Sequence, residues 1–143
     1  MKKLPIYFFS EDTNYSIKHK THIRNWINNT IIKEGYTLHT LNFIFCSDDY
    51  LLNINQQYLN HNTYTDIITF DNSDVKGEIQ GDVFISINRI FENAKKFNVS
   101  KSEELHRVII HGTLHLLGYK DKSKADKQKM TEKENESLHL RAF

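Results

Sequence analysis

The stretch His111-Gly-Thr-Leu-His115-Leu-Leu-Gly118-Tyr119-Lys-Asp121 holds two histidines four residues apart, followed by a glycine and an aspartate. Residues four apart lie on one face of a helix, one turn from each other, so the two imidazoles are expected side by side. Gly118 can end such a helix and let the chain return, which brings Asp121 towards the same point. The spacing predicts a three-ligand metal site with an open fourth position, as a catalytic zinc needs to hold water.

The residues around this pair predict a helix that is buried on two sides. Apolar side chains fall on two arcs of the helical wheel, and a narrow polar stripe separates them. A polar stripe inside a core needs partners, and a metal ion would satisfy both imidazoles at once. Two core histidines with separate hydrogen bonds are the alternative. One arc has Leu105, Val108, Ile109, Gly112 and Leu116, the other Ile110, Leu114 and Leu117, and the stripe Glu104, Arg107, His111 and His115.

Gly112 follows the first histidine directly, where helical zinc proteases have the glutamate that acts as general base. Because glycine has no side chain, peptide hydrolysis by that mechanism lacks its base, and a metallopeptidase is disfavoured. Gly112 falls on an apolar arc instead. There we expect it to let the helix approach a neighbouring strand closely.

Length and composition predict one cytoplasmic domain that spans residues 1–143. Hydrophobic residues make up 38% and charged residues 26%, as is ordinary for a globular protein. No apolar run approaches the ~20 residues of a membrane span, and nothing resembles a secretory signal. Cys46, the single cysteine, cannot form an internal disulfide and is expected to be a buried hydrophobe.

The net charge of +1 conceals an uneven distribution along the chain. Residues 1–33 carry six basic and two acidic side chains, whereas residues 48–82 carry one basic and seven acidic. Near the predicted metal site the balance is basic, with Lys120 and Lys122 flanking Asp121. Lysines beside a metal-bound water suit a polyanionic substrate, because they contact phosphates. The lysines after residue 122 are interspersed with glutamates, which favours a solvated helix face.

Periodicity and capping residues predict the element order β-α-β-α-β-β-α-α-α. This order is typical of an α+β fold, here a small mixed sheet of about four strands covered by helices, with the metal site on a central buried helix. The expected strands are Ile6–Ser10, Thr37–Cys46, Asp66–Phe70 and Gly81–Ile87. The expected helices are Lys18–Glu34, one capped by Ser47 and ending near Tyr58, Asn88–Phe97, the histidine helix with a Ser100 and Glu103 capping box, and Ser123–Leu140.

Four segments of the chain resemble the YbeY-type rRNA maturation endoribonucleases, a family of small zinc-binding bacterial proteins. The matches run in the family's order from about residue 40 to residue 136, which makes them far more specific than the histidine pair. The matching segments are Asn55-x-x-Tyr58 with Thr65-Asp66-Ile67-Ile68-Thr69-Phe70, Gly81-Asp82-Val83-Phe84-Ile85-Ser86, His111-Gly-x-Leu-His115-Leu-x-Gly118-Tyr119, and Met130 with Glu134.

The resemblance implies a zinc-dependent hydrolase of the cytoplasm that holds one Zn²⁺ and cleaves RNA phosphodiester bonds. Its implied role is single-strand-specific endonuclease action in rRNA processing, ribosome maturation and quality control. The implied partners are RNA and a ribosomal subunit, with neither a membrane nor a nucleotide cofactor.

The family's metal ligands are three histidines, the third of them ten residues after the first. The first two match His111 and His115, but the third position holds Asp121. A carboxylate oxygen is an acceptable zinc ligand, and because aspartate is shorter than histidine the loop would have to lie nearer the metal. Its negative charge is expected to weaken the metal's Lewis acidity. A two-histidine site completed by water, or Asp121 as a base, are the alternatives.

A second departure concerns the residue after Tyr58, which is usually an arginine in the family and is Leu59 here. An arginine there would suit a phosphate, being a bidentate and permanently charged donor. Arg107, on the polar stripe, and Lys120 are the candidate catalytic residues that would supply the missing charge. Glu104 is expected either to pair with Arg107 or to orient an imidazole.

The missing arginine and the substituted ligand also support a function of another class. The protein would then be a ribosome-associated binding factor with a structural metal site and little catalysis. An open coordination position beside a basic groove would favour the enzyme, and a site closed by four protein ligands would favour the binding factor.

Overall fold

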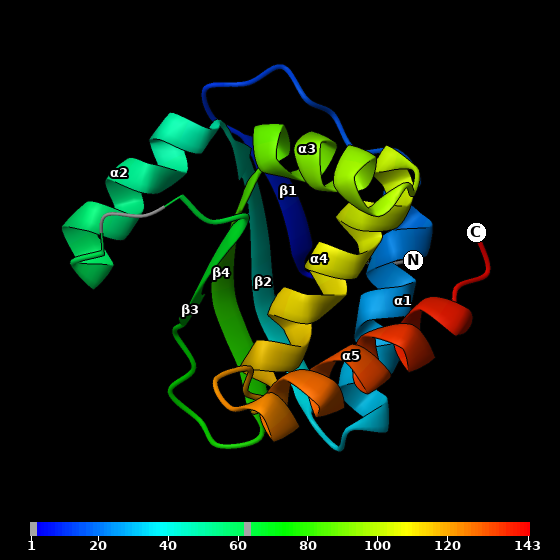
Figure 1. Cartoon of the computed structure of the whole chain (residues 1–143). Helices are drawn as coiled ribbons and strands as arrows, with labels where there is room; N and C mark the ends of the chain where they lie inside the picture. Colours follow the sequence, from blue (N-terminus) through cyan, green and yellow to red (C-terminus); the bar gives the residue numbers. More distant parts are fainter. Residues whose placement is uncertain (1–2, 62–63) are drawn as a thin grey trace.

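The computed structural model describes residues 3–61 and 64–143, and it has the predicted element order (Figure 1). The strands are β1 (Ile6–Ser10), β2 (Thr37–Cys46), β3 (Ile67–Asp71) and β4 (Glu78–Ser86). The helices are α1 (Lys20–Lys33), α2 (Asp48–Leu59), α3 (Ile87–Phe97), α4 (Lys101–Leu116) and α5 (Lys124–His139).

The four strands form one mixed sheet in the order β1-β2-β4-β3. β2 is parallel to β1 and to β4, and β3 runs antiparallel to β4. Parallel neighbours require a crossover connection, which α1 makes between β1 and β2, and α2 with β3 makes between β2 and β4. The predicted α+β fold, a mixed sheet covered by helices, is confirmed.

Several element boundaries differ from the prediction by one to three residues, most at the starts of β4 and α1. β4 begins at Glu78 rather than Gly81, because Glu78, Ile79 and Gln80 continue the parallel pairing with β2, where Ile79 is buried and Glu78 lies opposite Thr37. It ends at Ser86, whose hydroxyl accepts a hydrogen bond from Arg89 N and so caps α3. α1 begins two residues later than predicted, because His19 adopts a left-handed conformation with φ 61°.

The helices divide between the two faces of the sheet. α1, α3, α4 and α5 gather on one side, and α2 lies apart from them at the opposite side (Figure 1). The main core lies under the four helices, where Phe43 and Phe45 of β2 and Val83 and Ile85 of β4 are buried. A smaller cluster joins α2 to the other face through Leu51, Ile54, Cys46 and Ile68. α4 therefore has the sheet on one side and other helices around it.

The predicted wheel of α4 is confirmed. Its two apolar arcs are buried, and Arg107, His111 and His115 on the stripe are only partly buried. Gly112 lies against the sheet, since a Cβ atom there would be 2.9 Å from Ile67 Cδ1 and 3.0 Å from Val83 Cγ1. The close approach expected at Gly112 is therefore also confirmed, and it seats α4 on β3 and β4.

The capping box predicted at the start of α4 is only half formed. The Ser100 hydroxyl accepts from Glu103 N at 3.0 Å, as expected, but the Glu103 carboxylate pairs with Arg141 at 2.7 Å instead of returning to the cap. A complete capping box occurs at the start of α5, between Ser123 and Asp126.

Cys46 is buried and unbonded to another cysteine, as the sequence predicts. Burial raises the pKa of its thiol to about 12, so the sulfur stays protonated and unreactive at neutral pH. None of the helices described has both the length and the apolar character that crossing a membrane requires.

Gly81 of β4 provides a test of how tightly α4 is seated. A Cβ atom there would lie 2.6 Å from the Phe70 carbonyl oxygen and 3.1 Å from the Leu116 methyl groups. Because the Phe70 backbone cannot move aside, we expect Gly81→Ala to lower the free energy of unfolding by about 1–3 kcal/mol. Urea denaturation measures the change.

Gly112→Ala is the matched comparison. Its nearest neighbour is the flexible end of Ile67, and alanine gains about 1 kcal/mol of helix propensity over glycine, so the net loss should be smaller. Wild-type stability in Gly81→Ala would contradict the packing described for this position.

Candidate metal centre

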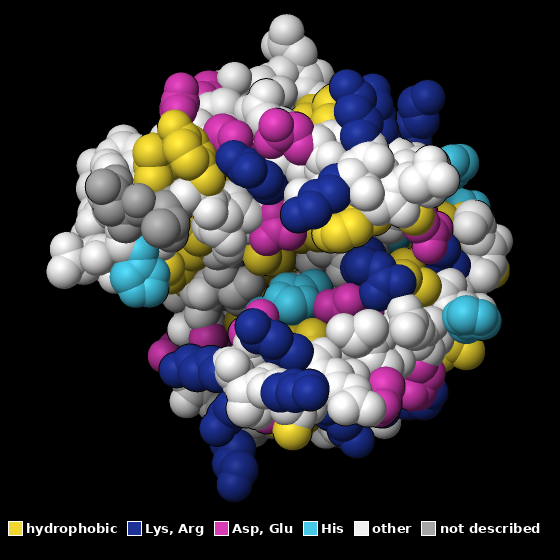
Figure 2. All heavy atoms as spheres, in the orientation of Figure 1, with side chains coloured by type: hydrophobic (Ala, Val, Ile, Leu, Met, Phe, Trp, Pro, Cys, Tyr) yellow, Lys and Arg dark blue, Asp and Glu magenta, His cyan; other side chains and the backbone are white. Residues whose placement is uncertain are grey.

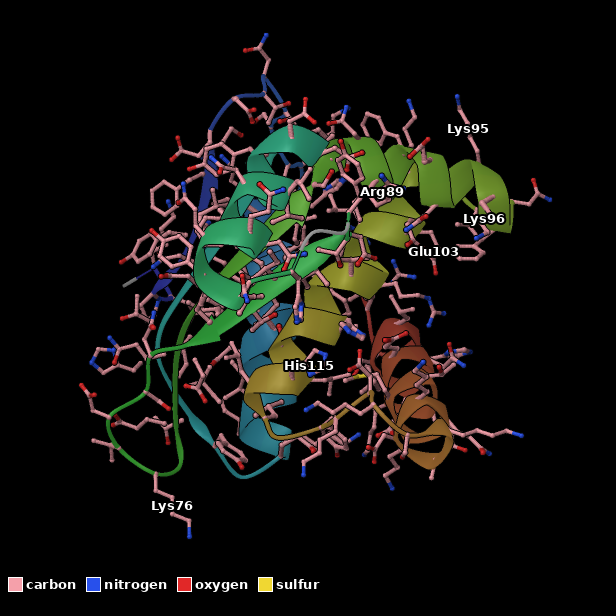
Figure 3. All side chains as sticks on the ribbon, turned by 60° about the vertical axis from the view of Figure 1, so that its left-hand side comes forward. Lys76, Arg89, Lys95, Lys96, Glu103 and His115 are labelled. Carbon is pink, nitrogen blue, oxygen red and sulfur yellow. The ribbon has the colours of Figure 1, made fainter. Side chains whose placement is uncertain are left out.

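His111 and His115 lie one turn apart on α4, and Asp121 lies on the loop that follows this helix. The Asp121 Oδ2 atom is 3.3 Å from Nε2 of His111 and 3.3 Å from Nε2 of His115. One potential ligand atom from each residue lies within 4.8 Å of the other two. The structure thus brings together the three residues that the sequence singled out. Figure 3 shows His115 on the part of α4 that lies between β3 and α5.

The spacing of these atoms fits a tetrahedral zinc ion. Ligand atoms that each lie ~2.0–2.1 Å from such an ion are about 3.3–3.5 Å from one another. The two distances of 3.3 Å from Asp121 agree with this value. Within residues 3–61 and 64–143, no fourth histidine, cysteine or carboxylate joins the group. The group could therefore give a metal ion three protein ligands, with a fourth position left for a molecule from the solvent.

Gly118 reverses the chain after α4, as the sequence predicts. Its φ of 100° is a left-handed conformation that favours glycine. The Gly118 N–H donates to the His115 carbonyl and the Tyr119 N–H to the Leu114 carbonyl, each at 3.0 Å, which satisfies carbonyls at the helix end. The loop then runs back along α4 and brings Asp121 to the histidines.

Each imidazole is oriented by a hydrogen bond at its Nδ1 atom. His115 Nδ1 lies 3.0 Å from the Tyr119 carbonyl, and His111 Nδ1 lies 2.6 Å from Oε2 of Glu134. A carbonyl and a carboxylate accept hydrogen bonds, so each Nδ1 carries the proton. In the neutral rings this leaves both Nε2 lone pairs free on the side that faces Asp121, which is the tautomer a metal ligand needs.

Glu134 of α5 orients the His111 imidazole, a role for which the sequence had suggested Glu104. Its other oxygen accepts from Arg107 Nη1 at 2.8 Å, so one buried carboxylate joins Arg107 to His111. The pairing expected between Glu104 and Arg107 is therefore wrong. Glu104 hydrogen-bonds Asn93 instead, while Arg107 bonds Glu134 and Asn135. The match of Glu134 to the family pattern was the one feature of the sequence that pointed to a role for this residue.

Carboxylates surround the His111 side of the centre. Burial raises the pKa of Asp66, and burial together with the negative charge of Asp66 raises the pKa of Glu104 to about 7. Burial alone would lower the pKa of His111, but the hydrogen bond to Glu134 and its charge outweigh burial and raise it. The carboxylates of Glu134, Asp121 and Asp66 thus favour positive charge at His111.

A cavity of about 850 Å³ opens over the three ligand residues. Figure 2 shows the histidines in a hollow, with carboxylates beside them and basic side chains on the surface around it. Of the candidate cations, Arg107 and Lys122 line the cavity, whereas Lys120 is exposed outside it. Leu59, at the position where an arginine was expected, lines it too. Other lining residues include Asn55, His61, Asp66, Thr69 and Glu104.

Asp82 and His106 lie away from this cavity. Asp82 accepts hydrogen bonds from Asn42 and Asn72. His106 is buried against Trp26 and Phe143, and burial, followed by the charge of Arg141, lowers its pKa to about 4. Both side chains therefore have structural partners away from the metal centre.

The chain matches known proteins over nearly its whole length. Residues 7–141 match the family model described as endoribonuclease YbeY. A protein named endoribonuclease YbeY from Cytophaga hutchinsonii is 53% identical over 143 residues, which is all of both chains. The protein of that name from Flavobacterium psychrophilum is 51% identical over 132 residues, 92% of this chain and 94% of the relative.

The fold is matched as well. The solution structure of TM1509 from Thermotoga maritima superposes with a TM-score of 0.62 at 29% identity, covering 94% of this chain and 87% of that one. The sequence motifs, the mixed sheet and the full-length matches agree with one another. The chain belongs to the endoribonuclease YbeY family.

Proposed function

We propose that this protein is a zinc-dependent endoribonuclease that cleaves single-stranded RNA in rRNA processing, ribosome maturation and quality control. Membership of the endoribonuclease YbeY family supports RNA cleavage and a cytoplasmic site of action on a ribosomal subunit. The observation that carries metal dependence is the placement of Asp121 Oδ2 3.3 Å from both histidine Nε2 atoms, under an open cavity.

His111, His115 and Asp121 are the residues that would hold the zinc ion. Two imidazole nitrogens with one carboxylate oxygen favour zinc over magnesium, which prefers oxygen ligands. A zinc ion held in this way supplies Lewis acidity, which polarises a phosphate oxygen or lowers the pKa of a water molecule. Glu134 and the Tyr119 carbonyl keep the two imidazoles in the tautomer that this role requires.

Arg107 and Lys120 are the proposed cations that stabilise negative charge on the phosphodiester, Arg107 from the cavity wall and Lys120 from the exposed surface outside the cavity. Arg107 lines the cavity next to the histidines, and its bonds to Glu134 and Asn135 use only two of its five N–H donors. A guanidinium there would stand in for the arginine that Leu59 replaces. Lys122 also lines the cavity, so we add it to Lys120 as a phosphate contact.

The geometry favours the enzyme over a binding factor with a structural metal. A structural zinc site is closed by four protein ligands, whereas the described part of the chain contributes three. The cavity of about 850 Å³ beside them gives a phosphodiester access to the fourth position.

Metal-depleted protein should cleave a single-stranded RNA only after zinc is added, and His115→Ala should abolish this cleavage because it removes a ligand. Gel analysis of an end-labelled RNA measures both effects. His39→Ala, at an exposed position on β2, is the matched control and should cleave normally. Zinc binding without zinc-dependent cleavage by folded wild type would instead support the binding factor.

Asp121→Ala should weaken zinc binding at least ~100-fold, which is the upper end of what the loss of an outer-shell partner costs a metal site. Competition with a chromogenic chelator measures the affinity. Asp74→Ala removes the same charge from the exposed loop between β3 and β4 and should leave it unchanged. Wild-type affinity in Asp121→Ala would remove this residue from the ligand set.

Arg107→Met should slow RNA cleavage about 100-fold at saturating zinc, as expected for the loss of one donor that stabilises developing negative charge. Arg107→Lys keeps a positive charge near Glu134 and should retain part of the rate. Single-turnover cleavage rates, measured beside the zinc affinity of each variant, separate the two contributions. Equal rates for wild type and Arg107→Met would exclude a catalytic role.

A further inference from the structure

Three side chains outside the cavity fasten the loop that carries Asp121. The Tyr119 hydroxyl donates a hydrogen bond to Oε1 of Glu34, the residue that ends α1. Lys133 of α5 lies 3.8 Å from Glu34 Oε2, and its Nζ is 5.8 Å from the centre of the Tyr119 ring. We call Tyr119, Glu34 and Lys133 the loop clamp. None of these three residues lines the cavity over the metal centre.

The main chain of Tyr119 belongs to the metal centre itself. Its carbonyl accepts the hydrogen bond from His115 Nδ1, and its N–H bonds the Leu114 carbonyl at the end of α4. Asp121 follows two residues later. One residue is thus joined to the second ligand through its backbone and to α1 and α5 through its side chain.

The position of Asp121 depends on the loop, because its own side chain is poorly packed. The Asp121 side chain is 42% exposed, and Lys120, Lys122 and Ser123 around it are exposed too. Tyr119 is the partly buried residue next to this exposed segment. Its contacts with Glu34 and Lys133 are charge-assisted, and those two side chains are only 21% and 23% exposed.

The attachment of the loop matters for metal binding because the third ligand position holds an aspartate. An aspartate reaches less far than a histidine would, so the backbone at residue 121 must be held near the two imidazoles. In the structure the carboxylate lies 3.3 Å from each Nε2. A loop free to move outward would lose this ligand before it lost the histidines, which α4 holds rigidly.

We propose that Tyr119 is a positioning residue that sets the metal affinity of the centre by holding Asp121 in reach of the ion, through its hydroxyl bond to Glu34 and the pairing of Glu34 with Lys133. The proposal rests on the metal site of the proposed function. It assigns to a hydroxyl outside the cavity a role in metal binding.

Tyr119→Phe tests this directly, since it removes the hydroxyl and keeps the ring and the backbone. Zinc affinity, measured by chelator competition, should fall about 10–100-fold, as for other outer-shell partners. In an Asp121→Ala background the same change should alter the residual affinity by less than about twofold, because independent changes add and coupled ones do not. An equal loss in both backgrounds would overturn the route through Asp121.

Two further measurements separate positioning from general stability. Glu103→Gln breaks an ion pair that shares no residue with the loop clamp, in which Arg141 Nη2 lies 2.7 Å from Glu103, and should leave zinc affinity unchanged. The Tm of each metal-free variant reports on folding. A Tyr119→Phe protein with a lower Tm and wild-type zinc affinity would overturn the proposal and show a purely structural role.

The outcomes also distinguish this inference from the proposed function. Zinc binding by wild type that is lost in His115→Ala, together with unchanged binding in Tyr119→Phe, would overturn the loop clamp alone. Wild-type protein that binds no zinc would overturn both.

Discussion

The polar stripe of α4 lies on a helix whose other faces are buried, so its side chains need polar partners from neighbouring elements. This need determines how α5 and the loop after α4 are placed. A buried polar group left without a partner costs about 1–3 kcal/mol, more if it is charged. The members of the stripe find partners on three other elements: Glu104 on α3, Arg107 and His111 on α5, and His115 on the following loop. No buried side-chain nitrogen or oxygen in the described residues lacks a partner. The placement of α5 and of the loop is therefore tied to the same groups that form the metal centre.

Gly112 affects both the packing of α4 and the chemistry available at the site. A side chain at this position would press on Ile67 and Val83, so a glycine allows α4 to lie directly on the sheet. A glycine there also leaves the centre without the neighbouring glutamate of helical zinc proteases. The position that brings the histidines over β3 thus directs the site away from peptide hydrolysis.

Local features of the sequence predicted most of the fold and the three residues that the structure brings together as a possible metal site. The four-residue spacing of His111 and His115, the stop at Gly118 and the alternation in β2 all depend on neighbours within one or two turns. Features that depend on distant contacts were predicted poorly. Glu104 was paired with Arg107 because the two are three residues apart, yet Glu134, 27 residues away, takes that place once α5 packs against α4. The start of β4 was predicted too late, at Gly81, although Glu78-Ile79-Gln80 already alternates between partly buried and buried positions and pairs with β2.

The three ligand positions fall within eleven consecutive residues, from His111 to Asp121, whereas the side chains that support them come from the distant residues Glu34 and Glu134. Only a short loop must close to gather the ligands, so even an unfolded chain can bring them to one ion at a small entropic cost. A metal ion stabilises a fold only to the extent that it binds the folded chain more tightly than the unfolded one. For this protein, such a thermodynamic link between metal and fold would run through Glu34 and Glu134, which reach the centre only when α1 and α5 are in place.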